Sequence, residues 1–143
     1  MDRAAQLVNQ ITTNNPTNPN NHHRQINCCV IGYGMSGKGF HCYMISINQK
    51  LNLHSIYIRD INQSQSVHID YPNVIIYTSW NDVLNDTDID LCVIATPPSA
   101  HYQQSIDLLH SNKHIVIDKP IVTNYNELQL IDNMNKLINH MWC

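Results

Sequence analysis

The residues most suited to chemistry in this chain are three glycines that directly follow an apolar run. Gly32, Gly34 and Gly37 have the spacing G-x-G-x-x-G and come after residues 26–31. In this pattern the first glycine permits a tight turn and the second lets a pyrophosphate approach the backbone. The third lets a helix pack closely on the sheet. The backbone N–H groups at the positive end of that helix would bind phosphates, so the spacing predicts a dinucleotide site.

Two charged residues follow the second expected strand, where a dinucleotide fold binds the adenosine ribose. The Asp60 carboxylate could accept hydrogen bonds from ribose hydroxyls, which favours NAD. The Arg59 guanidinium could instead pair with a 2′-phosphate, which favours NADP. A solvated Arg-Asp turn with no ligand is the alternative, and the residues leave the choice between NAD and NADP open.

The fourth and fifth expected strands are each followed by a segment that contains proline. Pro97 and Pro98 fix the chain after the fourth strand and withdraw backbone donors, so this segment would form a rigid wall. Lys119 follows the fifth strand within Asp-Lys-Pro, where a lysine could bind a substrate oxygen or donate a proton. Because ligands of open parallel sheets bind beyond the carboxyl ends of the strands, all these segments should share one edge.

Short apolar runs and helical patterns alternate along the chain from residue 26. We expect strands at 26–31, 53–58, 74–77, 91–95 and 114–117, and helices at 36–48, 80–85, 98–111 and 124–139. Residues 60–70 fit either a loop or a short helix. Strands that alternate with longer helices form right-handed βαβ units, so we predict an α/β fold with a doubly wound parallel sheet, the Rossmann dinucleotide-binding fold.

Apolar residues at helical spacing support the first and last of these helices. The first carries Phe40, Tyr43, Met44 and Ile47. The last begins at Asn124 as N-cap, with Glu127 three residues on, which is close to a capping box. Its expected inner stripe consists of Leu130, Met134 and Leu137.

The composition excludes several classes of protein. The formal net charge is −3 and the basic residues are scattered, so we expect neither a nucleic-acid partner nor membrane binding. No apolar run reaches transmembrane length, and the N-terminus lacks the apolar region of a signal peptide. We therefore expect a cytoplasmic protein. Apolar surface left uncovered at the edge of the sheet would favour self-association into a homo-oligomer.

The cysteines and histidines indicate neither a disulfide framework nor a metal site. The five cysteines include no C-x-x-C pair, and we expect them to be reduced and buried, as small apolar side chains. The nine histidines are dispersed without metal-ligand spacing, so no metal is expected.

The chain divides into two parts by composition. Residues 9–25 are rich in Asn and Pro and almost free of apolar side chains, so they cannot bury enough surface to offset the entropy cost of ordering. We therefore expect residues 1–25 to be a disordered tail and residues 26–143 to be an NAD(P)-binding Rossmann domain.

Two longer stretches resemble the Gfo/Idh/MocA oxidoreductases. Residues 88–101 read DIDLCVIATPPSAH, and residues 108–120 read LLHSNKHIVIDKP. The family combines G-x-G-x-x-G with D-x-V-x-I-A-T-P-x-x-x-H, G-K-H-V and E-K-P. The resemblance covers residues 26–138 and is strongest to the branch with NADP-dependent scyllo-inositol dehydrogenases. Asp118 replaces the usual Glu, and Asn112 replaces the Gly of G-K-H-V.

This resemblance implies a set of site residues. The pyrophosphate turn would consist of Gly32, Gly34, Met35, Ser36 and Gly37. The wall near the adenine ribose and nicotinamide would consist of Thr96, Pro97, Pro98 and His101. Asp118 and Pro120 flank the matched lysine, and together with Arg59 and Asp60 after the second strand they complete the expected cofactor-binding residues. Lys119 matches the lysine that helps to position substrate and nicotinamide in the family, so it is the implied catalytic residue.

The resemblance also implies a function. Family members transfer a hydride between NAD or NADP and a sugar, a polyol or a related secondary alcohol. Their second α/β domain, which supplies the acid–base residues, has no counterpart in these 143 residues, so we expect weak or no catalysis by this chain alone. A non-catalytic dinucleotide-binding or sensor module is the alternative, and a remnant that binds nothing tightly is a third possibility.

Overall fold

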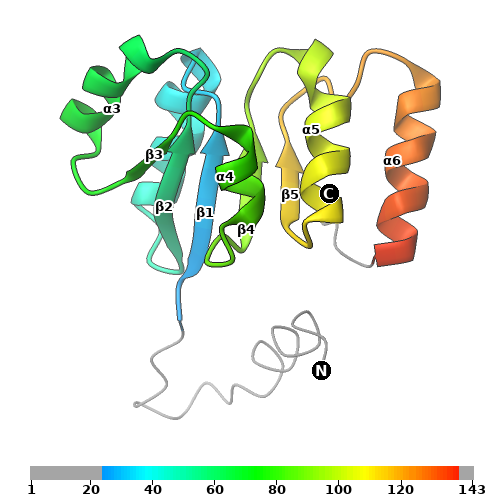
Figure 1. Cartoon of the computed structure of the whole chain (residues 1–143), viewed down its shortest axis with the longest axis horizontal. Coiled ribbons are helices and arrows are strands. Elements are labelled where there is room, and N and C mark those ends of the chain that lie inside the picture. The colour runs from blue at the N-terminus through cyan, green and yellow to red at the C-terminus, as the bar shows by residue number, and fades with distance from the viewer. Residues whose placement is uncertain (1–23, 139–143) are drawn as a thin grey trace.

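The computed structural model describes residues 24–138 (Figure 1). Most of the expected tail, residues 1–23, lies outside this range, as do residues 139–143. Two residues assigned to the tail contact the domain. Arg24 pairs with Asp90, with 2.5 Å between Nη2 and Oδ1, and the Gln25 amide donates to the Gln49 carbonyl. The packing of the domain therefore includes these two residues before the first strand.

A parallel sheet of five strands forms the centre of the domain, in the order β3-β2-β1-β4-β5. The strands are β1 (Ile26–Ile31), β2 (Leu51–Tyr57), β3 (Ile75–Tyr77), β4 (Leu91–Ile94) and β5 (His114–Ile117). This order places β1 at the centre, with the chain extending first to one side and then to the other, as in a doubly wound fold. The predicted fold class is confirmed, and β1 and β5 have their expected bounds.

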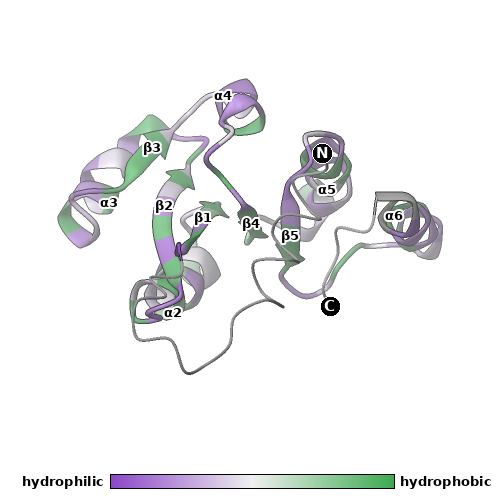
Figure 2. Ribbon diagram, turned by 90° about the horizontal axis from the view of Figure 1, so that it is seen from below, coloured by the Kyte–Doolittle hydropathy of each residue, from purple (hydrophilic) through white to green (hydrophobic). Residues whose placement is uncertain are grey.

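Helices cover both faces of the sheet (Figure 2). They are η1 (Gly37–Cys42), α2 (Tyr43–Ser46), η2 (Ile61–Gln63), α3 (Ser64–Asp70), α4 (Trp80–Asn85), α5 (Pro98–His110) and α6 (Tyr125–Ile138). One core cluster joins β1 and β2 to α2 and α3, and the other joins β1, β4 and β5 to α4, α5 and α6. Successive residues of β1 alternate between them, with Cys28 in the first cluster and Cys29 in the second.

The first helix is displaced in phase from the sequence pattern. Phe40, Tyr43, Met44 and Ile47 are each about half exposed, whereas Cys42 and Ile45 are buried against the sheet. The reason is a π-helical turn over Gly37–Cys42. Its hydrogen bonds join residues five apart instead of four, so the side chains that follow are rotated relative to those of a regular α-helix. The apolar spacing therefore marks the outer face of this helix.

The last helix has a different inner stripe from the one expected. Ile131 is buried and Met134 packs on the second core cluster, but Leu130 is half exposed. The side chain of Leu137 lies outside the described part of the structure. The predicted N-cap is confirmed, because Asn124 Oδ1 accepts the Glu127 backbone N–H at 3.0 Å.

The described cysteines are buried and reduced, as expected: Cys28, Cys29, Cys42 and Cys92 are all fully buried. Burial raises the pKa of the Cys28 and Cys42 thiols to about 12. Within residues 24–138, no helix is both long and apolar enough to cross a membrane.

Candidate functional site

The glycine turn after β1 requires glycine at two of its three positions. Gly32 has φ +100°, and a Cβ atom there would lie 3.0 Å from the Ala95 carbonyl oxygen. A Cβ at Gly37 would lie 2.0 Å from the Gly32 carbonyl oxygen, so any side chain would force the helix off the turn. At Gly34 a Cβ would meet no protein atom within 4 Å. Open space beside the second glycine is what a pyrophosphate requires.

Tyr33 anchors the turn to α3. Its ring is buried, and its hydroxyl donates to Asp70 at 2.5 Å. The Lys38 ammonium lies 2.6 Å from the same carboxylate and 5.5 Å from the centre of the Tyr33 ring. The hydrogen bonds from Lys38 and Tyr33 lower the pKa of Asp70, while burial and the carboxylate raise the pKa of Tyr33. These contacts fix the conformation of the turn before any ligand binds.

A cavity of about 300 Å³ opens at the carboxyl ends of the strands beside this turn. Six of the expected site residues line it: Gly32, Gly34, Arg59, Asp60, Thr96 and Pro97. Six further lining residues were not predicted: Tyr33, Tyr57, Gln63, Ala95, Ala100 and Gln104. Four of them could have been found from their positions at the carboxyl ends of strands or on the helix that follows. Tyr57 ends β2, Ala95 follows β4, and Ala100 and Gln104 lie one turn apart on α5.

The two charged residues after β2 differ in their contacts. The side chain of Asp60 accepts the Asn62 backbone N–H at 3.0 Å and thereby caps η2. Arg59 is exposed at the same cavity. Across the cavity, the Thr96 hydroxyl donates to Gln104 at 2.5 Å. A carboxylate and a guanidinium are therefore both available to the ribose of a bound nucleotide.

The remaining expected residues do not line this cavity. Met35 is almost fully exposed at the start of the helix, while Gly37 is buried beneath the turn. Ser36 donates its hydroxyl hydrogen bond to Asp118, which also accepts the Lys119 backbone N–H at 2.8 Å. The hydrogen bond from Ser36 lowers the pKa of Asp118. These polar groups thus bind one another and join the glycine helix to the segment after β5.

His101 lies inside the protein rather than at its surface. Its side chain is buried between two loops, with Nδ1 2.9 Å from the Pro120 carbonyl oxygen and Nε2 2.7 Å from the Thr96 carbonyl oxygen. Pro98 begins α5, the helix that carries His101. Lys119 and Pro120 are exposed beyond β5, so Lys119 is accessible to a ligand at this edge.

These features fit a dinucleotide. A turn with open space at Gly34, a helix that begins beside it and a cavity that ends at Arg59 and Asp60 could hold the pyrophosphate and one ribose. Within residues 24–138, no three His, Cys, Asp or Glu side chains are grouped so that they could hold a metal ion.

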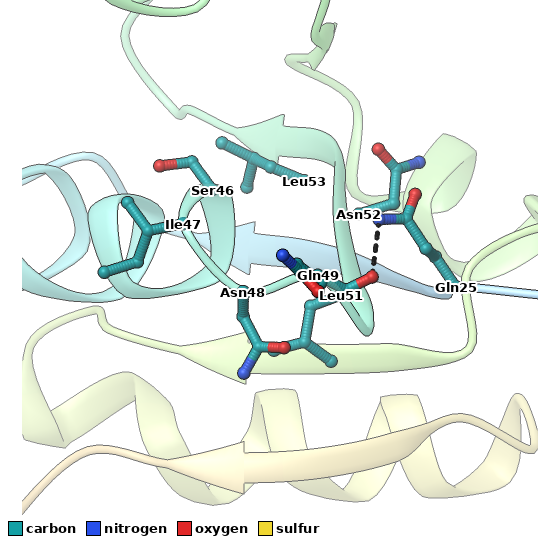
Figure 3. Close-up of a pocket in the computed structure, with 8 residues that line it drawn as sticks. All are labelled: Gln25, Ser46, Ile47, Asn48, Gln49, Leu51, Asn52 and Leu53. Atoms are coloured by element: carbon teal, nitrogen blue, oxygen red, sulfur yellow. Dashed lines mark hydrogen bonds between the residues drawn. The ribbon is translucent and has the colours of Figure 1, made fainter.

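A second concavity of about 320 Å³ lies near the amino ends of the strands, at the turn between α2 and β2 (Figure 3). It is lined by Gln25, Ser46, Ile47, Asn48, Gln49, Leu51, Asn52 and Leu53. None of these side chains titrates near neutral pH, and three of the amides are hydrogen-bonded within the protein. Gln25 donates to the Gln49 carbonyl, Asn48 accepts the Lys50 N–H, and Asn52 donates to the Asn27 side chain. This hollow is therefore unsuited to acid–base chemistry.

Comparison with known proteins agrees with the geometry. Residues 26–138 match the family model Gfo/Idh/MocA, described as an oxidoreductase family with an NAD-binding Rossmann fold. The NAD-binding protein from Listeria innocua superposes with a TM-score of 0.76 and is 26% identical, with 82% of this chain and 34% of that protein covered.

Two curated relatives show the same pattern. An uncharacterized oxidoreductase of Escherichia coli (strain K12), YdgJ, is 32% identical over 107 residues, which are 75% of this chain and 30% of the relative. The scyllo-inositol 2-dehydrogenase (NADP(+)) IolW of Bacillus subtilis (strain 168) is 26% identical over 98 residues, which are 68% of this chain and 26% of the relative. The chain thus spans less than a third of the length of these relatives.

The match covers every described strand and helix and includes the glycine turn, the cavity and the segment that carries Lys119. It confirms the expected cofactor class, NAD or NADP. The chain belongs to the Gfo/Idh/MocA family of oxidoreductases, and its residues 26–138 form the family's NAD-binding Rossmann fold.

Proposed function

We propose that this chain forms the nucleotide-binding part of an NAD(P)-dependent oxidoreductase that acts on a sugar, a polyol or a related secondary alcohol. The observation that supports this most directly is the glycine turn, in which Gly34 leaves open space beside the cavity at the carboxyl ends of β1, β2 and β4. The name of the relative IolW, a scyllo-inositol dehydrogenase, supports a polyol as substrate. We also propose a cytoplasmic location and a homo-oligomer.

In this proposal the chain positions the reactants. When bound, the nicotinamide ring supplies the hydride acceptor or donor. Gly32, Gly34, Met35, Ser36 and Gly37 form the turn and helix start that hold the pyrophosphate, and the cavity beside Arg59 and Asp60 takes the adenosine ribose. Lys119, exposed beyond β5, donates a hydrogen bond to the substrate oxygen and so orients the carbon that reacts.

The test is a titration of the whole purified chain with NADH and with NADPH, followed by nicotinamide fluorescence. Gly34→Val should lower the affinity by at least about tenfold, because its side chain occupies the open space beside the turn. Gly39→Val is the matched control, since a Cβ at Gly39 also meets no protein atom within 4 Å. Unchanged affinity in Gly34→Val, or no saturable binding by the wild type, would contradict the proposal.

Turnover separates the catalytic proposal from a non-catalytic binding or sensor module. Polyol-dependent reduction of NAD(P)+ that is lost in Lys119→Ala, with cofactor affinity retained, would support catalysis. Saturable binding without turnover by the whole chain would support the binding module. Lys119 is the suitable residue for this test because it is exposed at the site edge and its substitution removes no core contact.

A further inference from the structure

Two histidines contact the segment that carries Lys119. His41 belongs to η1 and His101 to α5, and each reaches a different residue of the segment 118–120. We propose that both are positioning residues, which hold this segment so that Lys119 faces the nicotinamide end of a bound dinucleotide. The inference rests on the proposed function. His41 was not among the residues expected from the sequence, and His101 was expected to form part of the cofactor wall.

The contacts of His101 carry the first half of the argument. Its ring is 1% exposed, and its two nitrogens lie within hydrogen-bond distance of backbone carbonyls from two separate loops. One carbonyl belongs to Thr96, after β4, and the other to Pro120, after β5. A buried imidazole without partners would be costly, so these contacts favour a single arrangement of the two loops. The ring therefore acts on the ligand through the backbone.

The contacts of Asp118 carry the second half. Its carboxylate accepts hydrogen bonds from the Ser36 hydroxyl and the Lys119 backbone N–H. His41 Nε2 lies 3.6 Å from Asp118 Oδ2, and this buried nitrogen forms no hydrogen bond. Both carboxylate oxygens are thus engaged within the protein, so Asp118 serves to hold its segment against the glycine helix.

Together these contacts fix the backbone on both sides of Lys119. Residue 118 is held through its carboxylate and residue 120 through its carbonyl, while the Lys119 side chain remains exposed. A backbone that is ordered before binding reduces the entropy cost of ligand contacts. The adenosine end of the site shares Thr96 with these contacts, but its charged residues Arg59 and Asp60 follow β2 and contact neither histidine's partner segment 118–120.

The experiment compares two ligands that differ only by the nicotinamide base. Affinities of the whole chain are measured for NADPH and 2′-phospho-ADP-ribose, or for NADH and ADP-ribose if the chain binds NADH. His101→Phe should weaken binding of the dinucleotide by about tenfold, the value of one lost hydrogen bond of about 1.4 kcal/mol, and weaken binding of the fragment much less. His110→Asn, at the exposed end of the same helix, is the control.

Conservative variants test the geometry. In His101→Asn the amide nitrogen replaces Nδ1 and can still donate to Pro120, whereas in His101→Gln it replaces Nε2 and faces Thr96. Affinity for the dinucleotide should recover more in His101→Asn than in His101→Gln. His41→Asn should show the same selective loss as His101→Phe, with the exposed His68→Asn as its control.

The outcomes separate the two proposals. If the wild type binds neither dinucleotide, the proposed function fails and this inference fails with it. If the wild type binds and the His41 and His101 variants weaken the dinucleotide and the fragment equally, the histidines serve folding alone. In that case only the positioning role is overturned. Selective loss at the nicotinamide end, with recovery in His101→Asn, supports it.

Discussion

Individual residues at this site divide into those that face a ligand and those that hold others in place. Arg59, Asp60 and Lys119 expose charged groups at the carboxyl edge of the sheet. Ser36 and Asp118 are also polar and lie near the same edge, but they hydrogen-bond to one another. Residue type therefore indicates which side chains can contribute to the site. Their hydrogen-bond partners decide whether they are free to touch a cofactor.

The two residues after β2 should discriminate between the cofactors. Arg59→Ala should weaken NADPH binding by about tenfold and NADH binding much less, because only NADPH carries a 2′-phosphate for the guanidinium. Asp60→Ala should weaken NADH binding more than NADPH binding, because the carboxylate accepts from ribose hydroxyls and repels the phosphate. Fluorescence titrations of each variant with both cofactors measure these ratios.

A control is needed because Asp60 also caps η2 through the Asn62 backbone N–H. Asp60→Asn keeps an oxygen for this cap and removes only the charge. If Asp60→Ala and Asp60→Asn differ strongly in thermal stability, the cap contributes to the Ala result. An effect of Arg59→Ala that is equal for both cofactors would remove Arg59 from the phosphate site.

At the scale of elements, the packing of the first helix on the turn decides the shape of the site. Gly37 allows the start of η1 to approach the Gly32 carbonyl, and the π-helical turn then directs Cys42 and Ile45 into the core. Tyr33 and Lys38 connect the same region to α3 through Asp70. The turn is thus supported by two helices as well as by β1.

Two glycines of this helix provide a matched pair for stability. Gly37→Ala should destabilise the chain by at least about 2 kcal/mol, because its Cβ would overlap the Gly32 carbonyl oxygen and the backbone must move. Gly39→Ala should stabilise it by up to about 1 kcal/mol, because alanine is the better helix former and the added methyl group meets open space. Urea denaturation of both variants measures the difference, and equal midpoints would refute the close-packing argument.

At the scale of the whole molecule, a polar network at the amino edge of the sheet joins elements on both sides of β1. Asp86 accepts hydrogen bonds from the Tyr77 hydroxyl at 2.8 Å and from the Asp88 backbone N–H at 2.8 Å. His54 Nε2 lies 3.0 Å from the same carboxylate, and the buried Lys113 donates to the Asp86 carbonyl at 2.6 Å. Strands β2 and β3, the end of helix α4 and the start of β5 meet here, and His54, Tyr77, Asp86 and Lys113 do not line the candidate cavity.

This network should make stability fall in acid. Burial raises the pKa of Asp86, but the hydrogen bonds from Asp88, His54 and Tyr77 outweigh it and hold the pKa below its ordinary value of 3.8. A lowered folded-state pKa contributes stability that is fully present above the ordinary value and is lost as pH falls through the folded-state pKa. Urea midpoints measured from pH 6 down to pH 2 should therefore fall less steeply in Asp86→Asn than in the wild type.

The slope difference should correspond to less than about one bound proton. Asp82→Asn removes a charge from an exposed position of α4 and is the matched control. Parallel curves for Asp86→Asn and the wild type would show that the network does not contribute through this carboxylate.

Much of this fold follows from local patterns. The apolar run 26–31, the G-x-G-x-x-G spacing and the capping pair Asn124 and Glu127 each predict a structure that depends on near neighbours in the chain, and each prediction is confirmed. The outward face of the first helix was not predictable in the same way. Its phase depends on a π-helical turn that begins at Gly37, which packs closely against Gly32, and this packing is a tertiary contact.

The amino-acid sequence by itself determined the doubly wound fold and the class of cofactor, because periodicity and glycine spacing are local properties. It also predicts the carboxyl edge of the sheet as the place of the site, where the structure has a cavity. Only the tertiary structure decided which polar residues face the cavity and which bind one another. His41 and His101 meet the segment of Lys119 across 78 and 18 residues of chain, counted from Lys119 back to each histidine. Contacts of this kind arise because parallel strands bring the ends of distant segments to one edge of the sheet, and no local pattern encodes that arrangement.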